Sequence, residues 1–410
     1  MGKLGPGLIT GAADDDPSGI ATYSQAGAKF GLNLLWTMAL TYPLMVGIQM
    51  ISAQIGRVSG RGLASNIRLH YPSWLLYCAV GLLLVANIIN IAADVAAMGE
   101  ALKLIIGGPR QLYTVFFGLL SLLLQVFVPY HSYVRILKWL TLVLFAYVGT
   151  VFVVHIPWAE VAIRTFWPQV SWTQDYFTTV VAVFGTTISP YLFFWQTSQE
   201  VEDIRADPAA TPLRKAPDQA AANLDRIKLD TVIGMGFSSI VGFFIMLTTA
   251  VTLHLHGVTD IESSSQAASA LRPIAGEFAF VLFSTGIIGT GLLALPVLAG
   301  SAAYAVSGAF TWKNSLERKP ATAKRFYGII ALSIMAGVAL AFTPMDPIKA
   351  LFWSAVINGV ISAPIMFVMM TMAVRSDVMG QFRIPRGLRW LGWLATSAMA
   401  LTVLAMFATL

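Results

Sequence analysis

A run of three acids in the first apolar segment of the chain carries the clearest chemical signal. The run and the residues after it read Asp14, Asp15, Asp16, Pro17, Ser18 and Gly19. Carboxylates and free carbonyls are the oxygen ligands that hard divalent cations prefer. Pro17 removes a backbone donor and favours a departure from helix, which leaves carbonyl groups free beside the carboxylates. The pattern predicts an anionic, irregular site for a hard cation.

A second apolar stretch is interrupted in a similar way between residues 184 and 191. Gly185 and Pro190 interrupt the apolar stretch, and Thr186 and Ser189 lie between them. Transporters with inverted repeats bind substrate where the discontinuous helices of the two repeats face each other. The two interruptions fall in the first and sixth of the spans predicted below, which are corresponding positions. They therefore predict two broken helices with a substrate between the breaks.

The elements that position these residues must be membrane helices. Of the 410 residues, 57% are hydrophobic and only 11% are charged, against about 25% charged residues in soluble domains. So few charges cannot cover a water-exposed surface at this length, so the lipid bilayer is expected to be the main solvent of the chain. A helix needs about 20 apolar residues to cross the hydrocarbon core. Eleven segments are candidates: 5–28, 32–56, 74–106, 111–128, 132–154, 176–198, 228–255, 277–310, 323–343, 347–374 and 388–409.

The fold prediction is an all-α membrane protein with two inverted five-helix repeats and one further helix. We place the first repeat at 1–154, the second at 155–374 and the eleventh helix at 375–410. The longest polar insertion, 199–227, is predicted to be a partly ordered loop and not a domain.

Basic residues are divided unequally between the two sides of these spans. With the N-terminus placed in the cytoplasm, 20 of the 26 Lys and Arg residues fall on the cytoplasmic side, as the positive-inside rule requires. The sequence thus predicts a multi-pass protein of the cell (inner) membrane with a cytoplasmic N-terminus and an outside C-terminus. The net charge of +6 comes from these short loops, so we expect no nucleic-acid partner.

The remaining composition excludes several classes of site. The single cysteine, Cys78, provides neither a disulfide framework nor a thiolate metal cluster. The five histidines lie near the ends of spans, so none is placed as a mid-membrane ligand. The sequence has no serine triad, His-rich cluster or nucleotide loop. We therefore expect no enzyme and no cofactor, with the metal ion as cargo.

Most acids lie in loops or at the ends of predicted spans, but four lie inside spans away from the ends: Asp14, Asp15, Asp16 and Asp94. One charge at mid-bilayer costs roughly 2.5–3.5 kcal/mol on insertion scales, so three in succession need a compensating partner. The other interpretation of the run is a surface loop before the first true span. Apolar residues flank the run on both sides, and 20–28 alone is too short to span, which favours the membrane interpretation.

At these motifs the chain resembles the Nramp family of divalent-metal transporters, which share the leucine-transporter fold. The matching stretches are Gly5-Pro6 through Gln25-Ala26-Gly27, then Leu34-Leu35-Trp36 and Ile48-Gln49. The family's metal motif Asp-Pro-Gly-Asn corresponds to residues 16–19, and its sixth-span motif Gly-Ala-Thr-Val-Met-Pro-His corresponds to 185–191. The resemblance implies that Asp16 coordinates the metal directly.

The chain departs from the family at several of these positions. Gly19 stands where the family has its Asn ligand, Ser189 replaces the thioether ligand, and Tyr191 replaces a nearby His. In the third span the family carries Asp-Leu-Ala-Glu, a pair implicated in proton movement; here Asp94 is retained and Ala97 replaces the Glu. This pattern resembles the Nramp-related magnesium transporters, a bacterial branch of the family.

The substitutions change the ion that the site should favour. A methionine sulfur favours Mn²⁺ and Fe²⁺ over Mg²⁺ and Ca²⁺, so its loss removes that discrimination. Mg²⁺ dehydrates reluctantly and keeps several waters while it touches one or two carboxylates. We therefore expect a partly hydrated Mg²⁺, with Mn²⁺ also accepted. The expected site consists of Asp16 as a direct or water-mediated ligand, Asp15 and Asp14 around the water shell, the Thr186 carbonyl, the Ser189 hydroxyl, the space left at Gly19, and Asn358.

Several side chains keep two interpretations. Asn358 is either a ligand from the tenth span or one partner of an interhelical hydrogen bond. Asp94 is either a residual proton relay or a buried group paired with a neighbour. Asn87 and Asn90 are read as structural, with a role in the ion pathway as the alternative, and Tyr191 is expected to line the cavity.

The predicted function is uptake of divalent metal ions by alternating access. Loss of the Glu and His positions argues against strong proton coupling, and we expect a monomer. The first alternative is a proton-coupled Mn²⁺/Fe²⁺ transporter with a variant site. The second is an amino-acid or organic-cation carrier on the same fold, although such sites do not usually place three acids at the break. The paired breaks favour alternating access over an ion channel.

Overall fold

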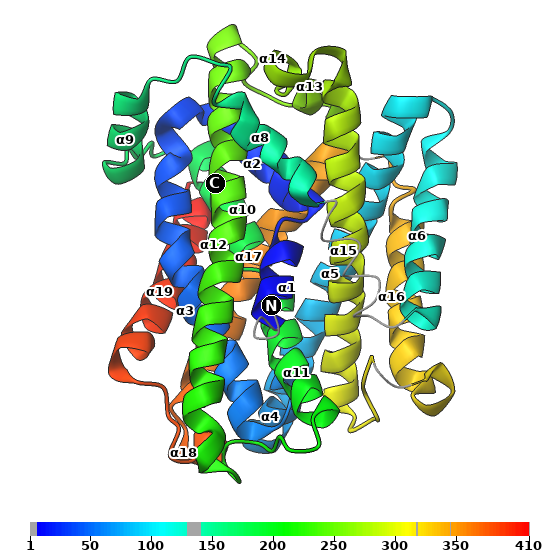
Figure 1. The fold of residues 1–410 in the computed structure, drawn as a ribbon, viewed down its shortest axis with the longest axis vertical. Helices are drawn as coiled ribbons and strands as arrows, with labels where there is room; N and C mark the ends of the chain where they lie inside the picture. The colour runs from blue at the N-terminus through cyan, green and yellow to red at the C-terminus, as the bar shows by residue number, and fades with distance from the viewer. Residues whose placement is uncertain (1–5, 129–140, 317–318, 345, 410) are drawn as a thin grey trace.

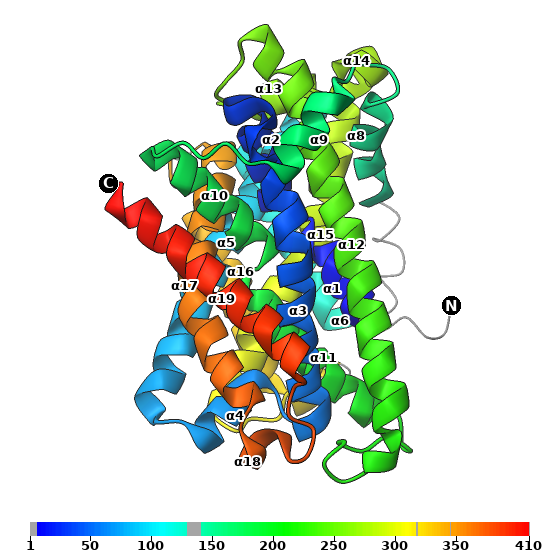
Figure 2. The same cartoon turned by 90° about the vertical axis from the view of Figure 1, so that its left-hand side faces the viewer.

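Helices are the only regular elements in the part of the chain that the computed structural model describes, residues 6–128, 141–316, 319–344 and 346–409. They stand side by side along the long axis of the molecule (Figures 1 and 2). The long helices are α3 (Leu35–Ser59), α5 (Ser73–Ile106), α6 (Arg110–Phe127), α12 (Ala220–Thr252), α15 (Ala279–Ala309), α16 (Lys324–Leu340), α17 (Pro347–Ala373) and α19 (Arg386–Ala408). The prediction of an all-α protein is confirmed.

The remaining helices form the breaks and the two ends of the molecule. They are α1 (Pro6–Asp14), α2 (Pro17–Phe30), α4 (Leu63–His70), α8 (Phe145–Thr150), α9 (Trp158–Phe166), α10 (Gln174–Thr187), α11 (Pro190–Ala206), α13 (Ser264–Ser269), α14 (Arg272–Ala275) and α18 (Ser376–Met379). In Figure 1, α13 and α14 lie at one end, which we call the α14 end. The opposite end carries α4 and α18, and we call it the α4 end.

Eight helical stretches among the described residues are long and apolar enough to cross a membrane. The difference from the eleven predicted spans has three causes. The second half of the first span and the second span join into one stretch, Pro17–Ser59. Helix α16, which corresponds to the predicted span 323–343, has only 17 residues and is not among the eight. The predicted span 132–154 lies partly outside the described residues, which contain only its end in α8.

The predicted loop at 199–227 is wrong over most of its length. Helix α11 continues to Ala206 and α12 already begins at Ala220, so only residues 207–219 connect them. The charged residues that suggested a loop are held at the helix ends, where the Arg226 guanidinium lies 2.5 Å from a Glu200 carboxylate oxygen. Paired charges therefore allow both helices to extend beyond their apolar parts.

The first break lies between α1 and α2, where Asp15 and Asp16 are not helical. Pro17 is the first residue of α2, a position at which the missing N–H of proline is not needed. Asp16 is the N-cap, with φ −70° and ψ 171°, and its side chain accepts the Gly19 N–H. Proline and a capping carboxylate thus end one half-helix and start the next.

The second break lies between α10 and α11, at Ile188 and Ser189. Pro190 is the first residue of α11, as Pro17 is of α2. The Ile188 carbonyl, which loses its helical partner at the break, accepts a hydrogen bond from the Ser362 hydroxyl of α17 at 2.7 Å. The prediction that the first and sixth spans are broken is confirmed.

Glycine contacts hold the half-helices against long helices. A Cβ on Gly11 of α1 would collide with the Gly234 carbonyl of α12, and a Cβ on Gly185 of α10 would collide with the Ala355 carbonyl of α17. Backbones can approach this closely only where the side chain is absent. Helices α12 and α17 therefore serve as the supports on which the two breaks are placed. The predicted repeat boundaries at 154 and 374 fall between helices, and the division into repeats stays a prediction.

Candidate metal-ion site

Asp16 is the buried side chain around which the two breaks meet. Its Oδ1 accepts hydrogen bonds from the Ser18 hydroxyl at 2.6 Å and from the Gly19 N–H at 2.8 Å. Its Oδ2 accepts the Tyr191 hydroxyl of α11 at 3.1 Å. The carboxylate is only 1% exposed. These bonds orient Asp16 toward the second break, and lone pairs remain on both oxygens for a metal ion or its water.

Asp14 and Asp15 face a different helix. The Ser238 hydroxyl of α12 lies 2.5 Å from Asp14 Oδ2 and 3.0 Å from Asp15 Oδ1. Because a serine has one proton, it can donate to only one of the two carboxylates at a time. The other oxygens, Asp14 Oδ1 and Asp15 Oδ2, are buried without a hydrogen-bond partner among the described residues.

The second break contributes hydroxyl and carbonyl oxygens. Ser189 donates to the Gly185 carbonyl at 2.7 Å and lies 2.9 Å from the Thr186 carbonyl. Thr186 Oγ1 lies 3.4 Å from the Ser18 hydroxyl across the junction of the breaks. The Gly19 position is adjacent, since a Cβ there would lie 3.3 Å from Thr186 Oγ1. Asp16, Gly19 and Thr186 therefore meet at one junction. Ser189 lies at the same break, and its hydroxyl turns back onto the carbonyls of α10.

Asn358 lies on α17 and pairs with Asn90 of α5. The Asn90 amide donates to Asn358 Oδ1 at 2.9 Å, and the Asn358 amide lies 3.3 Å from Asn90 Oδ1. This is the interhelical hydrogen bond that was the alternative to a ligand role. Asn87 is held in the same structural manner, since its amide donates to the Leu298 carbonyl and to the Ser301 hydroxyl, both at 2.8 Å.

Asp94 of α5 is buried and isolated. Its side chain is 0% exposed, and neither oxygen has a hydrogen-bond partner among the described residues. It lies within electrostatic reach of Asp16. A hydrogen-bonded pair, one of the two sequence interpretations, is thus not present in the described part of the chain.

The four buried acids are not neutralised by basic side chains in the described residues, where no Lys, Arg or His forms an ion pair with them. Nor do three or more His, Cys, Asp or Glu side chains converge there on one point as metal ligands. The acid run is therefore not a single three-carboxylate cage. It divides into Asp16 on one side and Asp14 with Asp15 on the other.

Three side chains have contacts that the sequence does not predict. Tyr191, predicted to line the cavity, donates directly to Asp16. Ser18 bonds the same carboxylate, and Ser238 of α12 bonds Asp14 and Asp15. The sequence signal for Tyr191 is its position directly after Pro190, at the break. The signal for Ser238 is its position between glycines within a predicted span. The partner of Ser238 could not be read from the sequence, because it lies more than 220 residues away.

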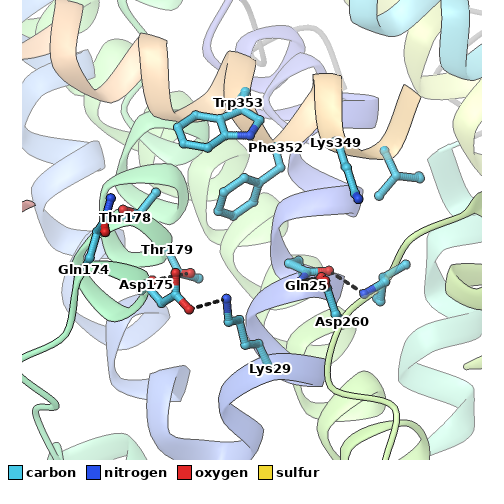
Figure 3. A pocket seen from close by; sticks show the side chains of 12 residues that line it. Gln25, Lys29, Gln174, Asp175, Thr178, Thr179, Asp260, Lys349, Phe352 and Trp353 are labelled. Atoms are coloured by element: carbon cyan, nitrogen blue, oxygen red, sulfur yellow. Dashed lines mark hydrogen bonds and ion pairs between the residues drawn. The ribbon is translucent and has the colours of Figure 1, made fainter. Parts of the chain in front are cut away.

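A cavity of about 250 Å³ with both polar and apolar walls lies above the site, toward the α14 end. Figure 3 shows its walls, which come from α2, α10, α17 and the segment around Asp260. The Lys29 ammonium of α2 and the Asp175 carboxylate of α10 are 2.8 Å apart. Gln25 donates to Asp260 at 2.6 Å and accepts the Ile261 N–H at 2.9 Å. Gln25 lies nine residues beyond Asp16, or roughly 13 Å of helix rise.

Solved structures with the same architecture are membrane transporters. A mutant of the Eremococcus coleocola manganese transporter aligns over 98% of this chain and 85% of its own, with TM-score 0.75 and 18% identity. Mhp1, a nucleobase-cation-symport-1 family transporter, aligns over 99% of this chain and 92% of its own, with TM-score 0.59 and 14% identity. These likenesses show a leucine-transporter-type fold.

The family is shown by the sequence. The model of the Nramp family, described as natural resistance-associated macrophage protein-like, matches residues 7–409, and the chain belongs to this family. A divalent metal cation transporter MntH of Mycobacterium tuberculosis is 26% identical over 97% of this chain and 89% of its own length. A protein of the same name from Burkholderia ambifaria is 24% identical over 96% and 85%. The chain is thus a multi-pass membrane transporter and not an enzyme.

Proposed function

We propose that this protein carries divalent metal ions across the cell membrane by alternating access, Mg²⁺ above all and Mn²⁺ as well, as partly hydrated ions. The observation that supports this most is the chemistry at the junction of the breaks. At Gly19 and Ser189 the polar neighbours are oxygens: the Asp16 carboxylate and the Thr186 hydroxyl at the first, and the Gly185 and Thr186 carbonyls at the second. These are the two positions at which the family resemblance expects an amide and a thioether ligand. The cargo is the metal ion itself, and no cofactor is needed.

Ligand chemistry favours Mg²⁺ at such a junction. Oxygen ligands suit Mg²⁺ and Mn²⁺, whereas a thioether would select softer ions. Asp16 supplies one carboxylate, and its Tyr191 and Ser18 partners can also hold water molecules of the ion. Mg²⁺ typically keeps several waters beside one or two carboxylates. On this ground we propose that the chain is one of the magnesium-transporting members of the family.

Competition between ions tests the selectivity. The purified protein in liposomes should take up Mn²⁺, and millimolar external Mg²⁺ should suppress that uptake. Mn²⁺ uptake undisturbed by millimolar Mg²⁺ would instead identify a manganese-selective transporter. That second candidate is favoured by one observation, namely that the relatives are named divalent metal cation transporter MntH and manganese transporter.

We also propose that uptake is weakly coupled or uncoupled to protons. Ala97 and Tyr191 occupy the positions of the family's Glu and His. An inside-negative potential of 100 mV favours entry of a 2+ ion by about 4.6 kcal/mol, which drives uptake without a coupled proton. A pH dye inside the liposomes should stay constant during metal uptake. Acidification that depends on the metal would show coupling, with Asp94 as the first candidate for the relay.

The proposed orientation places the α4 end and the N-terminus in the cytoplasm and the C-terminus outside, in a monomer. The uneven distribution of Lys and Arg supports it. Replacing Cys78 by Ser provides a background for single cysteines, because it is the only cysteine. In intact cells, an impermeant maleimide should label Glu262→Cys near the α14 end and leave Asp218→Cys near the α4 end unlabelled. The reverse pattern would invert the topology.

A further inference from the structure

We propose that a second hard divalent cation binds on the α12 side of the first break, held by Asp14, Asp15, the Ser238 hydroxyl and the Tyr23 hydroxyl. It would lie beside the cation at Asp16. The inference rests on the proposed function, because it takes the same class of ion. It differs in assigning a separate position to the two acids that do not face the second break.

The first support is the arrangement around Ser238. Its hydroxyl lies 2.5 Å from Asp14 Oδ2 and 3.0 Å from Asp15 Oδ1, so the two carboxylates approach each other across one small side chain. Like charges in such proximity repel in a buried site. A divalent cation between them converts this repulsion into attraction and leaves Ser238 free to bind the ion through its lone pairs.

The second support is a set of buried oxygen atoms without partners. Asp14 Oδ1, Asp15 Oδ2 and the Tyr23 hydroxyl have no hydrogen-bond partner among the described residues. Tyr23 is 0% exposed and within electrostatic reach of Asp14 and Asp15. The edge of its ring lies against α12, because a Cβ on Gly242, one turn after Ser238, would lie 3.1 Å from Tyr23 Cζ. Buried polar groups in native proteins are nearly always satisfied, so these three neighbouring oxygens are suited to hold a cation.

The third support is the balance of charge. Asp14, Asp15, Asp16 and Asp94 are each at most 1% exposed and form no ion pair with a basic residue in the described part of the chain. An ionised carboxylate buried without a counter-charge is strongly unfavourable. One divalent ion cancels two of the four charges. A second divalent ion at the Asp14 and Asp15 oxygens cancels the other two.

Counting bound ions tests the proposal directly. The purified full-length protein in detergent is equilibrated with Mn²⁺, and electron paramagnetic resonance measures free and bound ion. Wild type should bind two Mn²⁺ per chain, with the spectral broadening of two neighbouring ions. Ser238→Ala and Tyr23→Phe should each bind one ion without that broadening. Asp16→Asn should also bind one ion, now at the α12-side position.

Ser239→Ala is the matched control, since it removes a buried hydroxyl from the next residue of α12 that contacts neither carboxylate. It should bind two ions, and the thermal unfolding of all variants is compared with wild type to confirm folding. A single bound ion in wild type that is lost in Asp16→Asn would overturn the second position. The proposed function would still hold, and Asp14 and Asp15 would then be neutralised by protons. Absence of any bound ion in wild type, together with absence of transport, would overturn the proposed function itself.

Discussion

Neighbouring aspartates in the first break have unequal surroundings. Asp16 faces α11, from which Tyr191 donates to one of its oxygens, and Ser18 and Gly19 of α2 donate to the other. Asp14 and Asp15 face α12, where they share one serine and each keeps an unpartnered oxygen. The difference arises because an unwound joint directs successive side chains to different helices. Residues that are identical in the sequence can therefore serve different ions, or different stages in the passage of one ion.

The largest expected effect is a difference in metal affinity between substitutions of Asp16, which faces α11, and of Asp14, which faces α12. Asp16→Asn should weaken Mn²⁺ binding at the junction by more than about 100-fold, because even the indirect partners of metal ligands contribute about 10–100-fold. Asp14→Asn should change the affinity of that ion by no more than about tenfold, since Asp14 faces α12. Titration calorimetry of both variants measures the comparison. Equal losses would mean that the acids act as one site.

Tyr191→Phe tests the bond that orients Asp16. Removing the phenol hydroxyl leaves Asp16 Oδ2 without its partner and should lower metal affinity by about 10–100-fold. The ring is retained, so packing should be unchanged. Tyr304→Phe is the control, because this buried tyrosine contacts the backbone of Leu316 far from the break. Similar metal affinity in Tyr191→Phe and wild type would show that the hydroxyl does not position the carboxylate.

Ser189→Met should shift selectivity and leave the two acid faces in place. It introduces a thioether at the second break, which should raise the preference for Mn²⁺ over Mg²⁺. A gain of about tenfold, or about 1.4 kcal/mol, is expected in the ratio of the two dissociation constants. Competition of Mg²⁺ against Mn²⁺ uptake measures it. An unchanged ratio would mean that residue 189 does not approach the ion.

Lys29→Ala should have the smallest effect. The Lys29–Asp175 pair lines the cavity above the site and is partly exposed, with side chains 33% and 68% accessible. Such pairs contribute about 0–1 kcal/mol, so the rate of Mg²⁺ uptake should change by no more than about fivefold. The effect should fade at high salt. A complete loss of uptake would make this pair part of the transport machinery.

The helices and the breaks could be predicted from the sequence because they follow from local chemistry. Pro17 and Pro190 start half-helices for reasons that lie within a few residues, and long apolar runs identify the spans. The boundaries of α11 and α12 were misjudged, since the pairing of Arg226 with Glu200 lets charged segments remain helical.

The partners of the site residues could not be predicted in the same way. Ser238 meets Asp14, and Asn90 meets Asn358, over 224 and 268 residues of sequence. Such contacts depend on how the long helices pack and rotate, which composition and spacing do not determine. For the same reason the sequence predicts that the three aspartates belong to one site. In the structure Asp16 faces α11, whereas Asp14 and Asp15 face α12.

Flux measurements test most directly whether the transported ion binds at Asp16. Mg²⁺ uptake into proteoliposomes should be compared for wild type, Asp16→Ala and Asp225→Ala. Asp225 is an exposed acid near the α4 end and serves as the matched control. Wild type and Asp225→Ala should transport at similar rates, and Asp16→Ala should fall to the level of empty liposomes. Equal rates for Asp16→Ala and wild type would contradict the assignment of the site.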